Sequence, residues 1–184
     1  MAETQKYDYV YGYLNFSMRN ACYLAAPFFN PQQLDLVQQI EQTFERHKVN
    51  CFSPRLQHGN KKVAIESVEH ASEIFVENAR AINTCTWMLA VVDWLMPPGQ
   101  DLQVVNADGA TLRVRVPDSG TVWEMGYAKA LDKRIVIFTS RPPGERINIM
   151  LERSAIGVCY GFDALREYIL TGPSALTSWK GKLQ

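Results

Sequence analysis

The sequence predicts a three-layer α/β sandwich with a mostly parallel five-stranded sheet and one inserted β-hairpin. Apolar runs of strand length alternate along the chain with stretches of helical period, the order typical of a parallel sheet covered by helices. One of these runs, 86–92, is continuously apolar, as expected of a central strand covered on both faces. The segment 102–116 instead alternates apolar and polar residues around Asp108-Gly109, which is a strong hairpin signal.

The strands are predicted from short apolar runs that end at a proline or at a polar residue. Pro27 stops the first run, Pro54 closes the second and Asp93 ends the third. The predicted strands are 20–26, 49–53, 86–92, 134–138 and 156–160.

Helices are predicted between these strands and after the last one, from their start signals and from patterns of apolar or small residues. Asn30-Pro31 supplies an N-cap and a first-turn proline to a helix that runs through His47. Small residues in the helix 122–131 are expected to let it lie close to the sheet: Gly126, Ala128 and Ala130. The other predicted helices are 63–83 and 162–170.

Length and composition predict one globular domain. A chain of 184 residues can close a single hydrophobic core, and 47% apolar with 21% charged residues argues against disorder. We place the domain at 20–172, with the hairpin insertion at 101–116. An N-terminal extension, 1–19, precedes it, and a C-terminal tail, 173–184, follows it.

The charge balance excludes one class of function. With 19 basic and 19 acidic residues and no basic run, the chain lacks the charge with which proteins hold a nucleic-acid polymer, although a single nucleoside is not excluded. No apolar stretch is long enough to span a membrane, and no signal peptide is evident at the N-terminus. We therefore expect a soluble cytoplasmic protein.

The cysteines and histidines give no sign of a metal site. The four cysteines are far apart, and no histidine stands at metal-ligand spacing from them. Each cysteine lies in or beside an apolar run, so we expect small buried hydrophobic side chains at Cys22, Cys51, Cys85 and Cys159. Neither a metal nor an organic cofactor is predicted.

Ligands of open parallel sheets bind beyond the carboxyl ends of the strands, which directs attention to the start of the helix 122–131. Asp118-Ser119-Gly120-Thr121 offers free backbone N–H groups and a positive dipole end, with Gly120 among the candidate substrate contacts. Glu124 lies in the first turns, where it is a candidate nucleophile or general acid/base. The alternative is purely structural, with Asp118 as a cap and Glu124 as a residue that favours the first turns.

A second candidate segment follows the first predicted strand. Tyr23 places a phenol near the carboxyl end of this strand, and alternation turns it to the opposite face from Cys22 and Leu24. Phe28 and Phe29 could form a stacking wall for a planar base, and core packing is the alternative role for this pair.

Three motifs in this order make the chain similar to the nucleoside 2-deoxyribosyltransferases. The resemblance covers about residues 20–170 and implies a flavodoxin-like sandwich. It also implies a cytoplasmic enzyme of nucleotide salvage that needs no cofactor and acts on deoxynucleosides and free nucleobases. The motifs that carry it are Tyr23-Leu-Ala-Ala-Pro-Phe-Phe29, Asp118-Ser-Gly-Thr-Val-Trp-Glu124-Met-Gly-Tyr-Ala128 and Ile147-Asn148-Ile149-Met150.

The resemblance also implies roles for the matching residues. Glu124 falls where the family carries the nucleophile that holds the sugar as a covalent ester until a second base attacks. Tyr23 matches the tyrosine that orients this nucleophile, and Asp118 matches the carboxylate that binds sugar hydroxyls. Asn148 and Met150 match residues that a neighbouring subunit contributes, which implies a homo-oligomer.

The residues expected around the nucleobase match those of the family with one exception. Phe28, Phe29 and the Gln57-His58 loop match the region that holds the base. Where the family commonly has an acidic residue that handles the base proton, the register gives Asn78, with Glu77 beside it. An asparagine can hydrogen-bond a base nitrogen but cannot deliver a proton by ionising.

Two other functions stay open at this point. One is hydrolysis of a deoxynucleoside or of its 5′-monophosphate. The Asp118 carboxylate would repel a phosphate and so favours the free nucleoside, whereas Ser119 and Thr121 keep the phosphate possible. The other is a non-catalytic module that binds nucleosides or nucleotides, because a fold does not determine a function.

Overall fold

The computed structural model describes residues 21–58, 68–93, 117–144 and 146–183, together with Gly109 and the backbone of 102–105 and 111–114. The predicted N-terminal extension, 1–19, lies outside the described residues, as do the first five residues of the helix predicted at 63–83. The strands of the main sheet are β1 Cys22–Ala25, β2 Cys51–Phe52, β3 Trp87–Val91, β6 Arg134–Thr139 and β8 Gly157–Tyr160.

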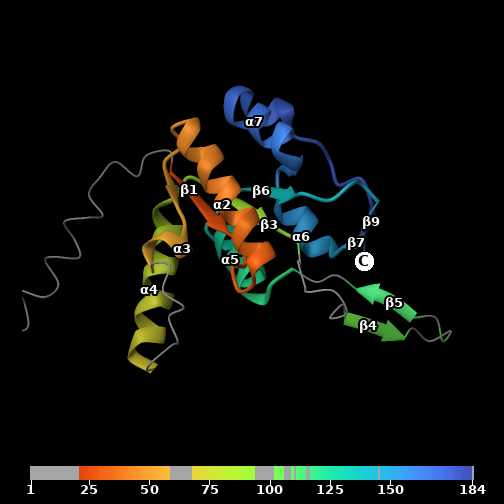
Figure 1. Ribbon diagram of the computed structural model, residues 1–184, viewed down its shortest axis with the longest axis horizontal. Coiled ribbons are helices and arrows are strands. Elements are labelled where there is room, and N and C mark those ends of the chain that lie inside the picture. Colours follow the sequence, from red (N-terminus) through yellow and green to blue (C-terminus); the bar gives the residue numbers. More distant parts are fainter. Residues whose placement is uncertain are drawn as a thin grey trace, which may run out of the picture.

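These five strands form one parallel sheet in the order β2-β1-β3-β6-β8 (Figure 1). Numbered along the sheet's own strands, this is the order 2-1-3-4-5 of the flavodoxin-like fold. The predicted α/β sandwich with a parallel five-stranded sheet is confirmed. The helices, with one 3-10 turn, are α2 Pro31–Arg46, α3 Pro54–Gln57, α4 Val68–Thr84, α5 Ser119–Ala130, α6 Ile149–Ser154, α7 Gly161–Thr171 and η1 Gly172–Ala175.

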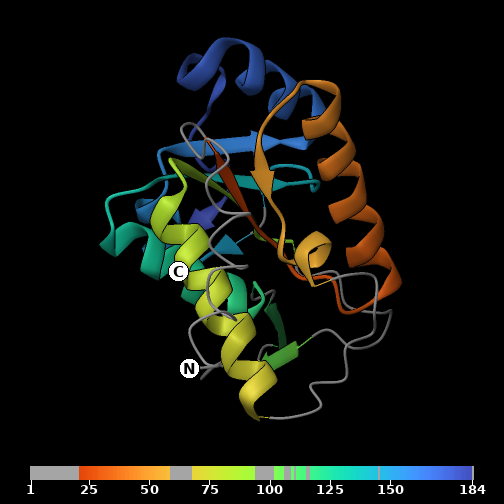
Figure 2. The same ribbon diagram turned by 90° about the vertical axis from the view of Figure 1, so that its left-hand side faces the viewer.

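The helices divide into two layers, one on each face of the sheet. In Figure 2, α2 lies on one side of the sheet and α4 and α5 on the other. The apolar side of α2 packs with α7 against Cys22, Leu24 and neighbouring strand residues. The opposite face carries Tyr23 and Ala25 and is covered by α4, α5 and α6. The predicted alternation along β1 is therefore confirmed, because Cys22 and Tyr23 belong to different clusters.

The helix α5 packs on the sheet through a different set of residues than we predicted. Thr121, Met125 and Ala128 form its buried side, at the spacing of one helical face. Gly126 and Ala130 are exposed, and a Cβ added at Gly126 would have no neighbour within 4 Å. The prediction of a close approach was thus wrong for these two residues, because they lie off the face that contacts the sheet.

The inserted hairpin forms a sheet of its own. Strands β4 Leu102–Val105 and β5 Thr111–Val114 pair antiparallel, as the sequence predicted. Gly109 lies between them with φ +77°, a conformation that glycine adopts without steric cost. The hairpin stands apart from the five-stranded sheet in Figure 1.

The end of the chain packs onto the domain. Strand β9 Lys182–Leu183 pairs with β7 Arg146–Ile147, and Thr177 bridges to Val158 in β8. Gly157 permits this approach, because a Cβ there would lie 2.6 Å from the Cβ of Leu176. The described part of the predicted C-terminal tail is thus in contact with the sheet's β8 edge.

The cysteines follow the prediction with one difference. All four are free; Cys22, Cys85 and Cys159 are buried, whereas Cys51 is half-buried on the edge strand β2. Within the described ranges, no three His, Cys, Asp or Glu side chains are grouped so as to hold a metal ion. Nor does any described helix combine the length and apolarity that crossing a membrane requires.

Candidate active site

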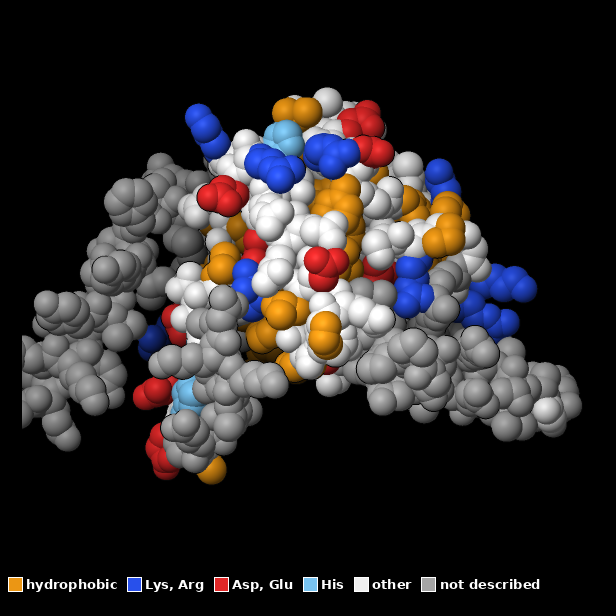
Figure 3. Space-filling model, in the orientation of Figure 1, with side chains coloured by type: hydrophobic (Ala, Val, Ile, Leu, Met, Phe, Trp, Pro, Cys, Tyr) orange, Lys and Arg blue, Asp and Glu red, His pale blue; other side chains and the backbone are white. Residues whose placement is uncertain are grey.

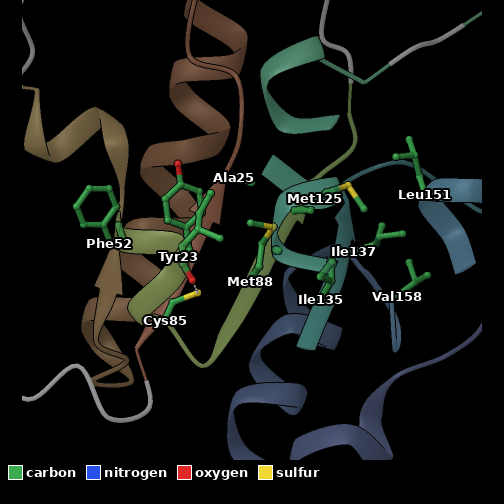
Figure 4. Close-up of a cluster of buried hydrophobic side chains, with 14 of the residues drawn as sticks. Tyr23, Ala25, Phe52, Cys85, Met88, Met125, Ile135, Ile137, Leu151 and Val158 are labelled. Carbon is green, nitrogen blue, oxygen red and sulfur yellow. Dashed lines mark hydrogen bonds between the residues drawn. The ribbon is translucent and has the colours of Figure 1, made fainter. Parts of the chain in front are cut away.

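Tyr23 is placed by the second position of β1 and by its neighbour on β2. It pairs in register with Phe52, and the two rings stack with centroids 5.6 Å apart and planes 12° apart. Figure 4 shows the two rings side by side in the cluster that continues through Met88 and Met125. The phenol is therefore held in one orientation by packing from both strands.

The Tyr23 hydroxyl donates a hydrogen bond to Oε1 of Glu124 over 2.5 Å. The two residues are 101 positions apart in the sequence and meet because α5 covers the face of the sheet on which Tyr23 lies. Burial raises the pKa of the Tyr23 phenol, so the hydroxyl keeps its proton and remains a donor to the carboxylate.

Glu124 has an unusual acidity for a glutamate. Its pKa is raised to about 7 as the net result of three causes: desolvation, the largest, raises it, the hydrogen bond from Tyr23 lowers it, and the Asp118 charge raises it. At neutral pH the carboxyl group therefore exchanges readily between its acid and its nucleophilic carboxylate form. This acidity and the fixed position suit covalent catalysis or proton transfer.

Asp118 caps the helix that carries Glu124. Its Oδ2 accepts a hydrogen bond from the backbone N–H of Thr121 over 3.0 Å. A Cβ added at Gly120 would lie 2.9 Å from this same oxygen, so a glycine here leaves room for the carboxylate. Asp118 and Gly120 thus occupy one small region at the start of α5.

Phe28 and Phe29 are not brought to Tyr23 and Glu124 by any described contact. Their rings stack on each other with centroids 5.4 Å apart. Phe28 packs against the cluster on the α2 side of the sheet, opposite to the face of Tyr23. Phe29 is 74% exposed, and its backbone N–H donates to Oε1 of the buried Gln33.

His58, which directly follows α3, and Asn78 on α4 are brought together. His58 Nε2 lies 3.3 Å from Asn78 Oδ1, and His58 Nδ1 lies 3.7 Å from a carboxylate oxygen of Glu77. Gln57, the last residue of α3, is exposed. The sequence predicted a loop at these positions, and the structure instead has the short helix α3 before His58.

Asn148 and Met150 lie at the start of α6. The Asn148 side chain caps this helix by accepting from the backbone N–H of Met150 over 2.8 Å. Met150 is 76% exposed, and the neighbouring Ile149 is also exposed.

Two polar clusters that order the carboxyl edge of the sheet were not predicted as part of the site. Asp93 follows β3, is buried, and accepts hydrogen bonds from the Thr139 hydroxyl and from the backbone N–H and hydroxyl of Ser140. An acidic residue directly after an apolar run was the only sequence signal for it.

The second cluster joins α2 to α3. The Arg55 guanidinium donates to the Glu41 carboxylate, which also accepts from the Ser53 hydroxyl over 2.6 Å. Both ends of this ion pair are almost fully buried. Because its members are 12 and 14 positions apart, no local pattern could have revealed it.

Glu124 is a hydrogen-bonded carboxyl group of raised pKa on a helix that covers a parallel sheet. The protein is therefore an α/β protein with a candidate site for catalysis by a carboxylate. A model of the nucleoside 2-deoxyribosyltransferase family matches residues 22–154, and the chain belongs to this family. The resemblance carried by the three sequence motifs is thereby confirmed.

One solved structure agrees with this assignment, and a second is a weaker match. A 2-deoxyribosyltransferase from the psychrotolerant bacterium Bacillus psychrosaccharolyticus matches with a TM-score of 0.64 and 25% identity, over 86% of this chain and 97% of that one. A 2-deoxyribosyltransferase from Leishmania mexicana matches with a TM-score of 0.45 and 22% identity, over 68% and 67% of the two chains. No curated protein sequence matches.

A more distant structure is a CMP N-glycosidase from Clostridium botulinum. It matches with a TM-score of 0.37 and 14% identity, over 90% of this chain and 88% of that one.

Proposed function

We propose that the protein transfers 2-deoxyribose between nucleobases, with Glu124 as the nucleophile. The observation that carries the proposal is the short hydrogen bond from Tyr23 to Glu124, on a carboxyl group whose pKa is raised to about 7. Family membership supports the reaction class.

In the first half of the reaction, the Glu124 carboxylate attacks C1′ of the deoxyribose. A bond forms from Glu124 Oε to C1′ as the bond from C1′ to the base nitrogen breaks, and its electron pair leaves with the base. The base then takes a proton from the medium. Tyr23 keeps the attacking carboxylate in place throughout this step.

In the second half, a different base loses its proton and attacks C1′ of the ester. The electron pair of the ester bond returns to Glu124, so the carboxylate is regenerated and no proton is gained or lost overall. Asp118, next to the start of the same helix, would hold sugar hydroxyls. Its negative charge favours an uncharged nucleoside over a 5′-monophosphate.

We also propose that the protein works as a homo-oligomer in which Asn148 and Met150 complete a neighbour's site. The exposed Ile149 and Met150 support this, because a second chain would cover them. Light scattering of the wild type, compared with a Met150→Glu variant, tests the assembly. A wild type that remains monomeric while it exchanges bases would contradict it.

The central test is a covalent adduct at Glu124. The protein is incubated with a 2′-fluorinated deoxynucleoside, which slows breakdown of the ester, and its intact mass is measured. We expect the mass of one fluorosugar per chain in the wild type and none in Glu124→Ala. The control is Glu167→Ala, an exposed carboxylate on α7, which should still be labelled.

Base-exchange assays complete the test. The wild type should move deoxyribose from one base to another, and Glu124→Ala should not. Free deoxyribose formed equally well with and without an acceptor base would identify a hydrolase instead. Binding of nucleosides with neither adduct nor turnover would identify a non-catalytic binding protein.

A further inference from the structure

His58 is held between two residues of α4 at the carboxyl side of the sheet. One ring nitrogen faces the Asn78 oxygen at 3.3 Å and the other faces the Glu77 carboxylate at 3.7 Å. The His58 side chain is only 16% exposed, whereas that of Glu77 is 47% exposed. The imidazole is thus ordered from both sides.

The chemistry of the three groups sets the direction of the bond to Asn78. An amide oxygen only accepts, so this contact is a hydrogen bond in the tautomer that carries its hydrogen on His58 Nε2, which then donates to Asn78 Oδ1. The remaining polar group of the Asn78 side chain is its NH₂, which has two N–H donors. An asparagine held by its oxygen therefore offers donors to whatever lies on its other side.

Asn78 belongs to the part of α4 that packs beside the Glu124 segment. One turn before it, Phe75 contacts Trp123, the residue next to Glu124, with ring centroids 5.2 Å apart. Just beyond it, the Asn83 amide donates to the Tyr127 hydroxyl on α5 over 2.8 Å. From the other direction, α3 follows directly on the strand whose Phe52 stacks on Tyr23.

We infer that His58 is a positioning residue that holds the Asn78 amide by its oxygen, so that the Asn78 N–H donors face the base of the nucleoside. This inference rests on the proposed function. The site then stabilises the departing base by donating hydrogen bonds to a lone pair on it, while the electron pair of the broken C1′–N bond remains on the base. Proton transfer from an ionisable side chain at position 78 plays no part.

As a consequence, the rate of base cleavage should depend more strongly on His58 when the base is a poor leaving group. A hydrogen bond to a group that gains charge contributes about 1.5–3 kcal/mol, or roughly 10- to 100-fold in rate. A base made more acidic by a fluorine atom needs this help less. The comparison uses the deoxynucleoside that the wild type cleaves best and its analogue with the fluorinated base, 5-fluorouracil against uracil or 2-fluoroadenine against adenine.

The variants are His58→Leu, which removes the donor, and His58→Gln, whose amide N–H can replace it. We expect His58→Leu to lower kcat for the parent base about 10-fold or more and for the fluorinated base much less, with KM changed little. His58→Gln should recover most of the wild-type ratio. The control His47→Leu, at the far end of α2, should leave both rates unchanged.

Equal losses for both bases in His58→Leu, or no recovery in His58→Gln, would overturn the inference and assign His58 a structural role. An unchanged rate in His58→Leu would overturn it as well. A wild type that neither exchanges nor releases any base would instead refute the proposed function, which separates the two failures.

Discussion

The two faces of the sheet are built for different purposes. The face covered by α2 and α7 is a closed apolar cluster that includes Leu24, Ile40 and Phe138. The face covered by α4, α5 and α6 is also apolar at its centre, but at its border it carries Tyr23, Glu124 and the His58 group. One face contributes mainly stability, and the other also carries the hydrogen-bonded pair of Tyr23 and Glu124.

The face of the molecule shown in Figure 3 has the mixed charge that the zero net charge of the chain suggested. Figure 3 shows basic and acidic side chains interspersed with apolar ones on the face in view. Neither sign of charge dominates there, which fits an uncharged substrate better than a polyanion.

The largest expected effect comes from a substitution in the apolar cluster under α2 and α7. Ile40 on α2 is fully buried, so Ile40→Ala should cost about 2–5 kcal/mol in the free energy of unfolding, measured by urea denaturation. The kcat of the folded fraction should stay unchanged. A reduced kcat at a temperature where the variant is folded would show that the two faces are not separate.

The next effect comes from removing the Tyr23 hydroxyl, which donates to the proposed nucleophile Glu124. Tyr23→Phe should lower kcat/KM about 10- to 100-fold, because the lost hydrogen bond is to a charged group. This bond lowers the pKa of Glu124, so the rise of kcat/KM with pH should move to higher pH in the variant. Tyr160→Phe, which removes a hydroxyl near the C-terminus, is the control. An unshifted pH profile would argue that Tyr23 does not contact the reactive carboxylate.

Glu124 itself should make stability fall as the pH rises. Its pKa is raised from 4.5 to about 7 in the folded chain, so the folded state binds the proton more tightly than the unfolded state. Above pH 7 this costs at most roughly 3 kcal/mol, and below about pH 4.5 the cost disappears.

The variant Glu124→Gln cannot ionise and should therefore be more stable than the wild type at pH 8 but not at pH 4. Urea unfolding at the two pH values measures the difference. A constant difference between the two chains across this range would mean that the folded chain leaves the acidity of Glu124 unchanged.

The smallest effect concerns the start of α5. In Gly120→Ala, the new Cβ would press on the Asp118 carboxylate, so KM for the deoxynucleoside should rise several-fold, about 1 kcal/mol, with a smaller change in kcat. Gly126→Ala is the matched control, because its Cβ meets nothing within 4 Å. If both variants behave alike, Asp118 does not bind the sugar.

Much of the fold could be predicted because local patterns determine it. Proline stops, the Asn30 cap and the apolar periods located the five strands of the sheet and the longer helices within a few residues. The short helices α3 and α6 were missed, because four to six residues contain too few turns for a period to show. The exposure of Gly126 and Ala130 was also not predicted, since small residues fit on the buried or the exposed side of a helix.

The candidate site, like the fold, could be predicted from the sequence only in part. The sequence determined which residues are candidates for the chemistry, namely the phenol of Tyr23 in the first strand and the carboxylate of Glu124 in the first turns of a capped helix. It also determined the face on which Tyr23 lies, because side chains alternate along a strand.

Only the tertiary structure decided which of these groups meet. It brings the Tyr23 hydroxyl within 2.5 Å of Glu124 across 101 positions, and it joins His58, which follows α3, to Asn78 on α4. The pKa of Glu124 depends on the surroundings that this packing creates. Desolvation and hydrogen bonding act through space, so no local pattern in the chain contains them.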